Sequence, residues 1–174
     1  MKQHGSKPCA RQPIILLQHG VTRMNPIHYL DDLKEGQRFG SGRFLMDAMS
    51  IKRFAAEFDP QPFHLDEDAA KATLFQGLAA SGWHTAAVTM RLFVESEFKP
   101  AGGTIGASLD ELKWYQPVRA DDELYLETEI LEVRPSKSRP EQGMVKARVT
   151  TYKQPGEVVQ VFVANLVVKR QITQ

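Results

Sequence analysis

Apolar residues recur at helical spacing in two parts of the chain. An apolar residue at every third or fourth position predicts a short helix from Ser50, its expected N-cap, to Phe58. In a second and longer helix, expected from Gly82 to about Glu97, apolar residues cover nearly the whole circumference. A helix that is apolar all round is buried. We therefore expect the rest of the fold to enclose the longer helix.

Apolar and polar residues alternate in several other segments, as they do along half-buried strands. Such segments begin near Ile105, Leu124, Val145 and Val159, and another strand is expected over residues 39–46. The strands mostly follow the helices in a run and do not alternate with them, which favours an antiparallel sheet with helices on one side. The pattern predicts an α+β fold, with an antiparallel β-sheet wrapped around a long central α-helix.

The first 23 residues differ in composition from the rest of the chain. They contain Lys and Arg but no Asp or Glu, and their apolar run, residues 14–17, is too short for a signal-peptide core. We expect residues 1–23 to be a disordered N-terminal extension and residues 24–174 to form one domain. An organelle-targeting signal is the alternative for the extension.

Composition and charge argue against several classes of partner. The net charge is +1 and no basic stripe is present, which argues against nucleic acid. No apolar run approaches the roughly 20 residues of a membrane span, which argues against a membrane. Cys9 is the only cysteine, so no intrachain disulfide can form. This composition suits a reducing compartment, and we expect a cytoplasmic protein.

Asp59 and His64 are the strongest candidates for chemistry. They stand at the two ends of a segment stiffened by Pro60 and Pro62, which we expect to be extended because the residue before a proline avoids the helical conformation. A histidine titrates near neutral pH, and a neighbouring carboxylate can fix its tautomer and help to position a water. The alternative is that both residues merely satisfy backbone groups at the end of a helix and in a turn.

Two segments carry a resemblance to a known family. Residues 58–66, FDPQPFHLD, resemble the hydratase signature of MaoC-like dehydratases and (R)-specific enoyl-CoA hydratases, and residues 112–122, LKWYQPVRADD, resemble a strand-turn segment of the same hot-dog-fold family. The resemblance implies a hot-dog domain that reversibly hydrates trans-2-enoyl-CoA to (R)-3-hydroxyacyl-CoA. It further implies that Asp59 and His64 together activate one water. No metal or redox cofactor is implied, and CoA enters only as part of the acyl-CoA substrate.

The resemblance also implies that the backbone N–H of Gly82 binds the thioester oxygen. Physical chemistry supports this role independently, because Ser81 can cap the helix and the unpaired N–H groups of a first helical turn favour negative charge. The alternative role for Gly82 is close helix packing, which requires the same residue type. His84, further along the helix, is a weaker candidate for the pocket and is more often a structural residue.

The chain departs from the family pattern at two positions. Gln61 stands where the family usually has Asn, and Met90 stands where a serine is often found, so Met90 is expected in the core or in a pocket wall. Both departures bear on the acyl specificity and leave the Asp59/His64 pair intact.

The sequence leaves two alternatives to the hydratase function and also suggests an oligomeric state. A hot-dog acyl-CoA thioesterase commonly uses a carboxylate on the long helix, and residues 82–94 contain none. A non-catalytic acyl-thioester binding protein is the second rival, and it leaves the joint presence of Asp59 and His64 unexplained. A sheet of about five strands has an edge with which a second copy could pair, so we expect a homodimer.

Overall fold

The structure, a computed structural model, describes residues 26–154 and 156–171. Its strands form one antiparallel sheet in the order β1-β4-β5-β6-β3, with β2 also paired to β4. The predicted antiparallel α+β architecture is confirmed, although the strand expected over residues 39–46 is split into β1 and β2. The sheet comprises β1 (Arg38–Gly40), β2 (Phe44–Leu45), β3 (Ile105–Trp114), β4 (Glu123–Pro135), β5 (Gln142–Lys153) and β6 (Val158–Lys169).

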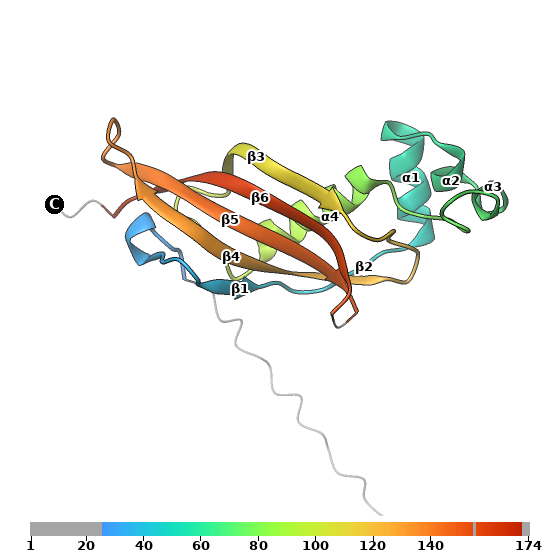
Figure 1. The fold of residues 1–174 in the computed structure, drawn as a ribbon, viewed down its shortest axis with the longest axis horizontal. Coiled ribbons are helices and arrows are strands. Elements are labelled where there is room, and N and C mark those ends of the chain that lie inside the picture. Colours follow the sequence, from blue (N-terminus) through green and yellow to red (C-terminus); the bar gives the residue numbers. More distant parts are fainter. Residues whose placement is uncertain (1–25, 155, 172–174) are drawn as a thin grey trace, which may run out of the picture.

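Helix α4 (Gly82–Glu95) runs along one face of this sheet (Figure 1). Its Val88, Leu92 and Phe93 are buried in a core that the strands complete from the other side. The prediction that the helix is enclosed all round is wrong for the single chain. Trp83 and Met90 remain 60% and 42% exposed, because the sheet covers only one side of the helix.

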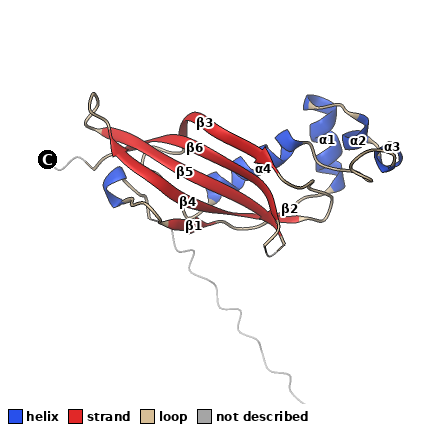
Figure 2. Cartoon of the chain, in the orientation of Figure 1, coloured by secondary structure: helices blue, strands red, loops and turns tan. Residues whose placement is uncertain are grey.

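Three further helices lie beyond the end of the sheet at which α4 begins, separated from the strands (Figure 2). Asp47 and not Ser50 caps the first of them, because the Asp47 side chain accepts a hydrogen bond from the Ser50 N–H at 2.8 Å. The segment after Asp59 is not fully extended, since Pro62 opens a one-turn helix, a position for which the proline ring is pre-organised. These helices are α1 (Ala48–Phe58), α2 (Pro62–Leu65) and α3 (Glu67–Lys71), and a 3₁₀ turn (Leu30–Asp32) precedes β1.

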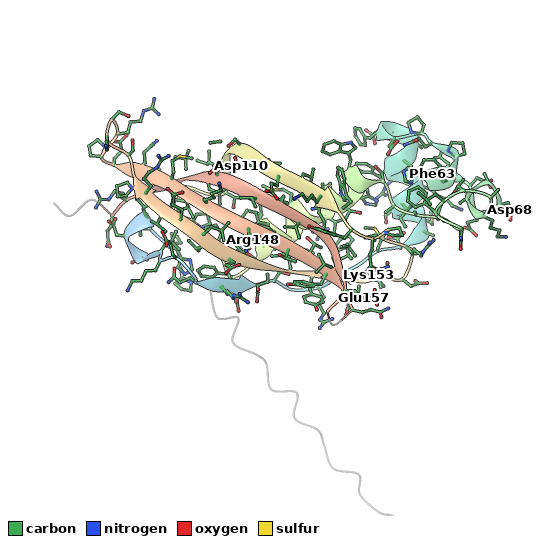
Figure 3. All side chains as sticks on the ribbon, in the orientation of Figure 1. Phe63, Asp68, Asp110, Arg148, Lys153 and Glu157 are labelled. Carbon is green, nitrogen blue, oxygen red and sulfur yellow. The ribbon has the colours of Figure 1, made fainter. Side chains whose placement is uncertain are left out.

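The sheet face away from α4 carries charged residues of both signs (Figure 3). Arg148 pairs with Glu129 at 2.9 Å, and Lys146 pairs with Asp110 at 2.7 Å. Solvated pairs of this kind contribute little to stability. Within the described part of the chain, no helix is long and apolar enough to cross a membrane. The extension expected over residues 1–23 lies outside the described residues.

Candidate active site

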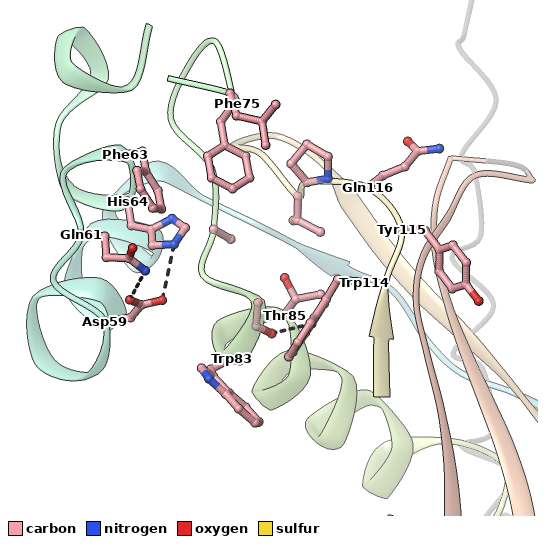
Figure 4. A pocket seen from close by; sticks show the side chains of 15 residues that line it. Asp59, Gln61, Phe63, His64, Phe75, Trp83, Thr85, Trp114, Tyr115 and Gln116 are labelled. Carbon is pink, nitrogen blue, oxygen red and sulfur yellow. Dashed lines mark hydrogen bonds and ion pairs between the residues drawn. The ribbon is translucent and has the colours of Figure 1, made fainter. Parts of the chain in front are cut away.

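The end of α1 and the turn of α2 bring Asp59 and His64 together (Figure 4). Asp59 is the C-cap of α1, where its N–H bonds the Ala55 carbonyl at 2.9 Å. His64 is buried on α2, and its Nε2 lies 3.4 Å from Asp59 Oδ2. The proline-containing connection between them therefore places the two side chains side by side.

The backbone carbonyl of Ala79 selects the tautomer of His64. His64 Nδ1 lies 2.7 Å from the Ala79 oxygen, and a carbonyl can only accept, so Nδ1 carries the ring proton. In the neutral form of the ring, Nε2 then has a lone pair on the side that faces Asp59. With Nδ1 as the donor, Nε2 and Asp59 Oδ2 are two acceptor atoms 3.4 Å apart. The structure thus places a histidine nitrogen and a carboxylate oxygen side by side at the cavity.

Both carboxylate oxygens of Asp59 are held by neighbouring side chains. Ser81 Oγ donates to Oδ2 at 2.6 Å, and Gln61 Nε2 donates to Oδ1 at 2.7 Å. The hydrogen bond from Ser81 is the largest influence on the pKa of Asp59 and lowers it; partial burial opposes this shift, while Gln61 and His64 reinforce it. The carboxylate therefore stays ionised near neutral pH. Sequence analysis identified Ser81 only as a helix cap, because nothing in the pattern places it against Asp59.

Ser81 also caps α4, since its Oγ accepts from the Trp83 N–H at 3.2 Å. Gly82, the first residue of the helix, lines the cavity in front of the pair. A Cβ on Gly82 would lie 2.9 Å from the Trp114 ring, and Trp114 Nε1 donates to the Gly82 carbonyl at 3.0 Å. Close packing against Trp114 is therefore sufficient to require glycine here. Binding of an oxygen by the Gly82 N–H is compatible with this packing and remains a prediction.

The cavity has a volume of about 520 Å³ and a largely aromatic wall. Among the described residues that line it, Asp59 is the sole Asp or Glu, and there is no Lys or Arg. A few polar groups surrounded by apolar side chains are typical of small-molecule sites. The larger apolar and aromatic side chains in this wall are Phe63, Leu74, Phe75, Trp83, Trp114 and Tyr115.

His84 does not line this cavity. Its ring stacks on Phe54 with centroids 4.6 Å apart and is buried. Burial lowers the pKa of His84 and so favours the neutral ring. The structural role considered for this residue fits its position between α1 and α4. Over residues 26–154 and 156–171, no three His, Cys, Asp or Glu side chains gather as metal ligands would.

Comparison with known proteins identifies related sequences and structures. Residues 33–153 match the family model described as MaoC like domain. The MaoC-like dehydratase from Rhodospirillum rubrum has a solved structure that is 54% identical, covers 84% of this chain and 99% of its own, and superposes with a TM-score of 0.80. The uncharacterized protein YdeM of Bacillus subtilis is 35% identical over 79% of this chain and 94% of its own length. An (R)-specific enoyl-CoA hydratase of R. rubrum is 31% identical over 55% of this chain and 65% of its own length.

Proposed function

The chain belongs to the MaoC-like domain family and has its hot-dog fold, and we propose that it catalyses the reversible hydration of trans-2-enoyl-CoA to (R)-3-hydroxyacyl-CoA. A fold alone does not define an activity. The observation that carries the proposal is the geometry of the pair, in which His64 Nε2 faces an ionised Asp59 at 3.4 Å inside a cavity with apolar walls. The (R) configuration and the CoA thioester are inferred from the (R)-specific enoyl-CoA hydratase that resembles this chain.

In the proposed reaction, one water donates to His64 Nε2 and to Asp59. Its oxygen bonds to the β-carbon of the substrate while Nε2 removes a proton from it. The electron pair of the double bond moves towards the thioester oxygen, and a proton returned by the pair then bonds to the α-carbon. Asp59 stabilises the imidazolium that forms between these two transfers, because its negative charge lies next to the ring.

The thioester oxygen acquires negative charge during this addition. The first turn of α4 is suited to bind it, since N–H groups at a helix N-terminus point outwards and the helix dipole favours an anion there. We assign this role to the N–H of Gly82, which lines the cavity together with Asp59 and His64. A donor in this position would polarise the carbonyl while the pair acts on the β-carbon.

The same proposal includes a homodimer formed through β3 and α4. Strand β3 is a sheet edge, and an unpaired edge strand can pair with a second copy of itself. Exposed apolar side chains accompany it, among them Trp83 and Met90 on α4 and Leu109 on β3, which is 58% exposed. Burying this face in a symmetric interface would enclose the long helix on its second side. A Leu109→Asp variant should shift the mass measured by light scattering from dimer to monomer.

The proposed activity is tested by incubating the protein with enoyl-CoAs of increasing chain length. Loss of the absorbance of the conjugated thioester reports hydration, and Asp59→Asn serves as the inactive control. Unchanged absorbance across all chain lengths would favour the non-catalytic acyl-thioester binder.

A further inference from the structure

We propose that Arg119 is a positioning residue of the active site, because it fixes the loop whose Ala79 carbonyl selects the tautomer of His64. Only the expected effect on turnover rests on the hydratase function proposed above. The tautomer is a property of the protein and can be measured without substrate. Arg119 belongs to the loop between β3 and β4 and does not line the cavity.

The Arg119 guanidinium holds two carbonyl groups of the loop that connects α3 to α4. Nη1 donates to the Leu78 oxygen at 3.3 Å, and Nη2 donates to the Phe75 oxygen. The loop is shaped around this group, since a Cβ on Gly77 would lie 3.2 Å from Nη1. A planar guanidinium that holds two acceptors fixes both position and orientation, which a single ammonium group cannot do.

Arg119 itself is anchored to the sheet. The backbone N–H of Arg119 donates to Asp122 Oδ2 at 2.8 Å. The same carboxylate oxygen lies 3.4 Å from Lys153 Nζ. The side chains of Asp122 and Lys153 are only 13% and 12% exposed, and Lys153 lies at the end of β5. Because this pair is largely shielded from water, it holds the β3–β4 loop more firmly than a surface ion pair would. The sheet therefore provides a rigid base from which Arg119 reaches the other loop.

The loop held by Arg119 continues directly into the active site. Ala80 N–H bonds the Val118 carbonyl at 2.8 Å, next to Arg119, and Ala79 N–H bonds the Phe63 carbonyl at 3.3 Å. The Ala79 oxygen then accepts from His64 Nδ1 at 2.7 Å. A continuous set of contacts thus runs from the sheet, through Arg119 and its loop, to the histidine ring.

Two acceptors compete for the single proton of the neutral His64 ring. The Ala79 carbonyl competes at Nδ1, and the Asp59 carboxylate competes at Nε2. A carboxylate is intrinsically the stronger acceptor, so the productive tautomer depends on the closer approach of the carbonyl, 2.7 Å against 3.4 Å. If the loop loosens, the proton can move to Nε2 and bond Asp59. A ring in that state has no lone pair at Nε2 with which to take a proton from water.

The tautomer can be read from the ¹⁵N chemical shifts of the His64 ring at about pH 8.5, where a free imidazole is neutral. In the wild type we expect protonated Nδ1 and unprotonated Nε2. Arg119→Met should shift the ring towards a mixture of tautomers and lower kcat about tenfold or more, with a smaller change in KM. Arg139→Met is the matched control, because Arg139 lies in the β4–β5 connection, away from the site, and should change neither quantity.

Arg119→Lys is the second variant, and it tests whether Arg119 controls the His64 tautomer if Arg119→Met does not fold. It keeps the charge but not the two-pronged geometry, so we expect a smaller tautomer shift in the same direction. An unchanged wild-type tautomer in the folded variants would overturn the inference. A shifted tautomer in Arg119→Met, together with no hydration by the wild type, would uphold the positioning role and reject the proposed hydratase function.

Discussion

Replacing Ser81 with Ala removes one hydroxyl that makes two hydrogen bonds, one as donor and one as acceptor. The hydroxyl donates to Asp59 Oδ2 at 2.6 Å and accepts from the Trp83 N–H at 3.2 Å, and Ser81 is only 1% exposed. We expect the substitution to affect stability and catalysis separately, because the first contact holds the carboxylate that we propose to be catalytic and the second caps α4.

The magnitude follows from these two contacts. A hydrogen bond to a charged group contributes about 1.5–3 kcal/mol, and an N-cap contributes about 1 kcal/mol. Ser81→Ala should therefore lower the free energy of unfolding by roughly 2–4 kcal/mol, or the melting temperature by roughly 5–12 °C for a domain of this size. With one of its two fixing bonds lost, Asp59 should support a kcat about tenfold lower. The pKa of Asp59 should rise, so the acid limb of kcat/KM should move to higher pH.

Ser96→Ala is a matched control at the other end of the same helix. Ser96 is also 1% exposed, and its hydroxyl likewise makes two bonds, donating to the Phe93 carbonyl at 2.7 Å and accepting from the Phe98 N–H at 3.2 Å. Thermal melting and steady-state hydration of both variants should show that both lose stability and only Ser81→Ala loses turnover. If Ser81→Ala keeps the wild-type kcat and acid limb, the hydroxyl is only a helix cap and the reasoning is refuted.

Three further predictions concern the same site. Asp59→Asn and His64→Gln should each reduce hydration by about 10²-fold or more with the circular dichroism spectrum retained, and near-wild-type turnover of either variant would contradict their roles. Folding lowers the pKa of Asp59, so its carboxylate stabilises the protein above the unfolded pKa of about 3.9 and loses this effect as pH falls through the folded pKa. Urea titrations should therefore show that Asp59→Asn is destabilised relative to the wild type at pH 7 and much less so at about pH 3. Gly82→Ala should lower stability through its collision with Trp114, and adding Trp114→Leu should restore it; a Gly82→Ala variant as stable as the wild type would show that the packing argument is wrong.

The sequence predicts those features that depend on local pattern. Alternation in β4 and β5 and the cap at Ser81 follow from neighbouring residues, and the structure confirms both. In β6, Val159 and Gln160 are both fully buried, next to a register shift between Thr151 and Tyr152 of β5. Alternation cannot anticipate such an irregularity, because it arises from pairing with the neighbouring strand.

Other features of the site depend on contacts between distant segments. The contact of Ser81 with Asp59 and the reach of Arg119 to the loop before α4 join residues that are far apart in sequence. Ala79 takes part only through its backbone N–H and carbonyl, which nearly every residue type carries, so its side chain gives no signal. The exposed side of α4 is a similar case, since an apolar helix surface does not reveal whether the same chain or a second copy covers it.

Hydration and hydrolysis of one substrate can be distinguished in a single sample of the purified protein. Hydration directs water to the β-carbon, and thioester hydrolysis directs it to the carbonyl carbon. Residues 82–94 of the long helix supply no carboxylate that could activate water at the carbonyl. With crotonyl-CoA or a longer homologue, we predict loss of the conjugated absorbance and formation of the (R)-3-hydroxyacyl-CoA, while a thiol-reactive dye detects no free CoA. Rapid release of thiol from a saturated acyl-CoA, with no hydration of any enoyl-CoA, would contradict the account and identify a thioesterase.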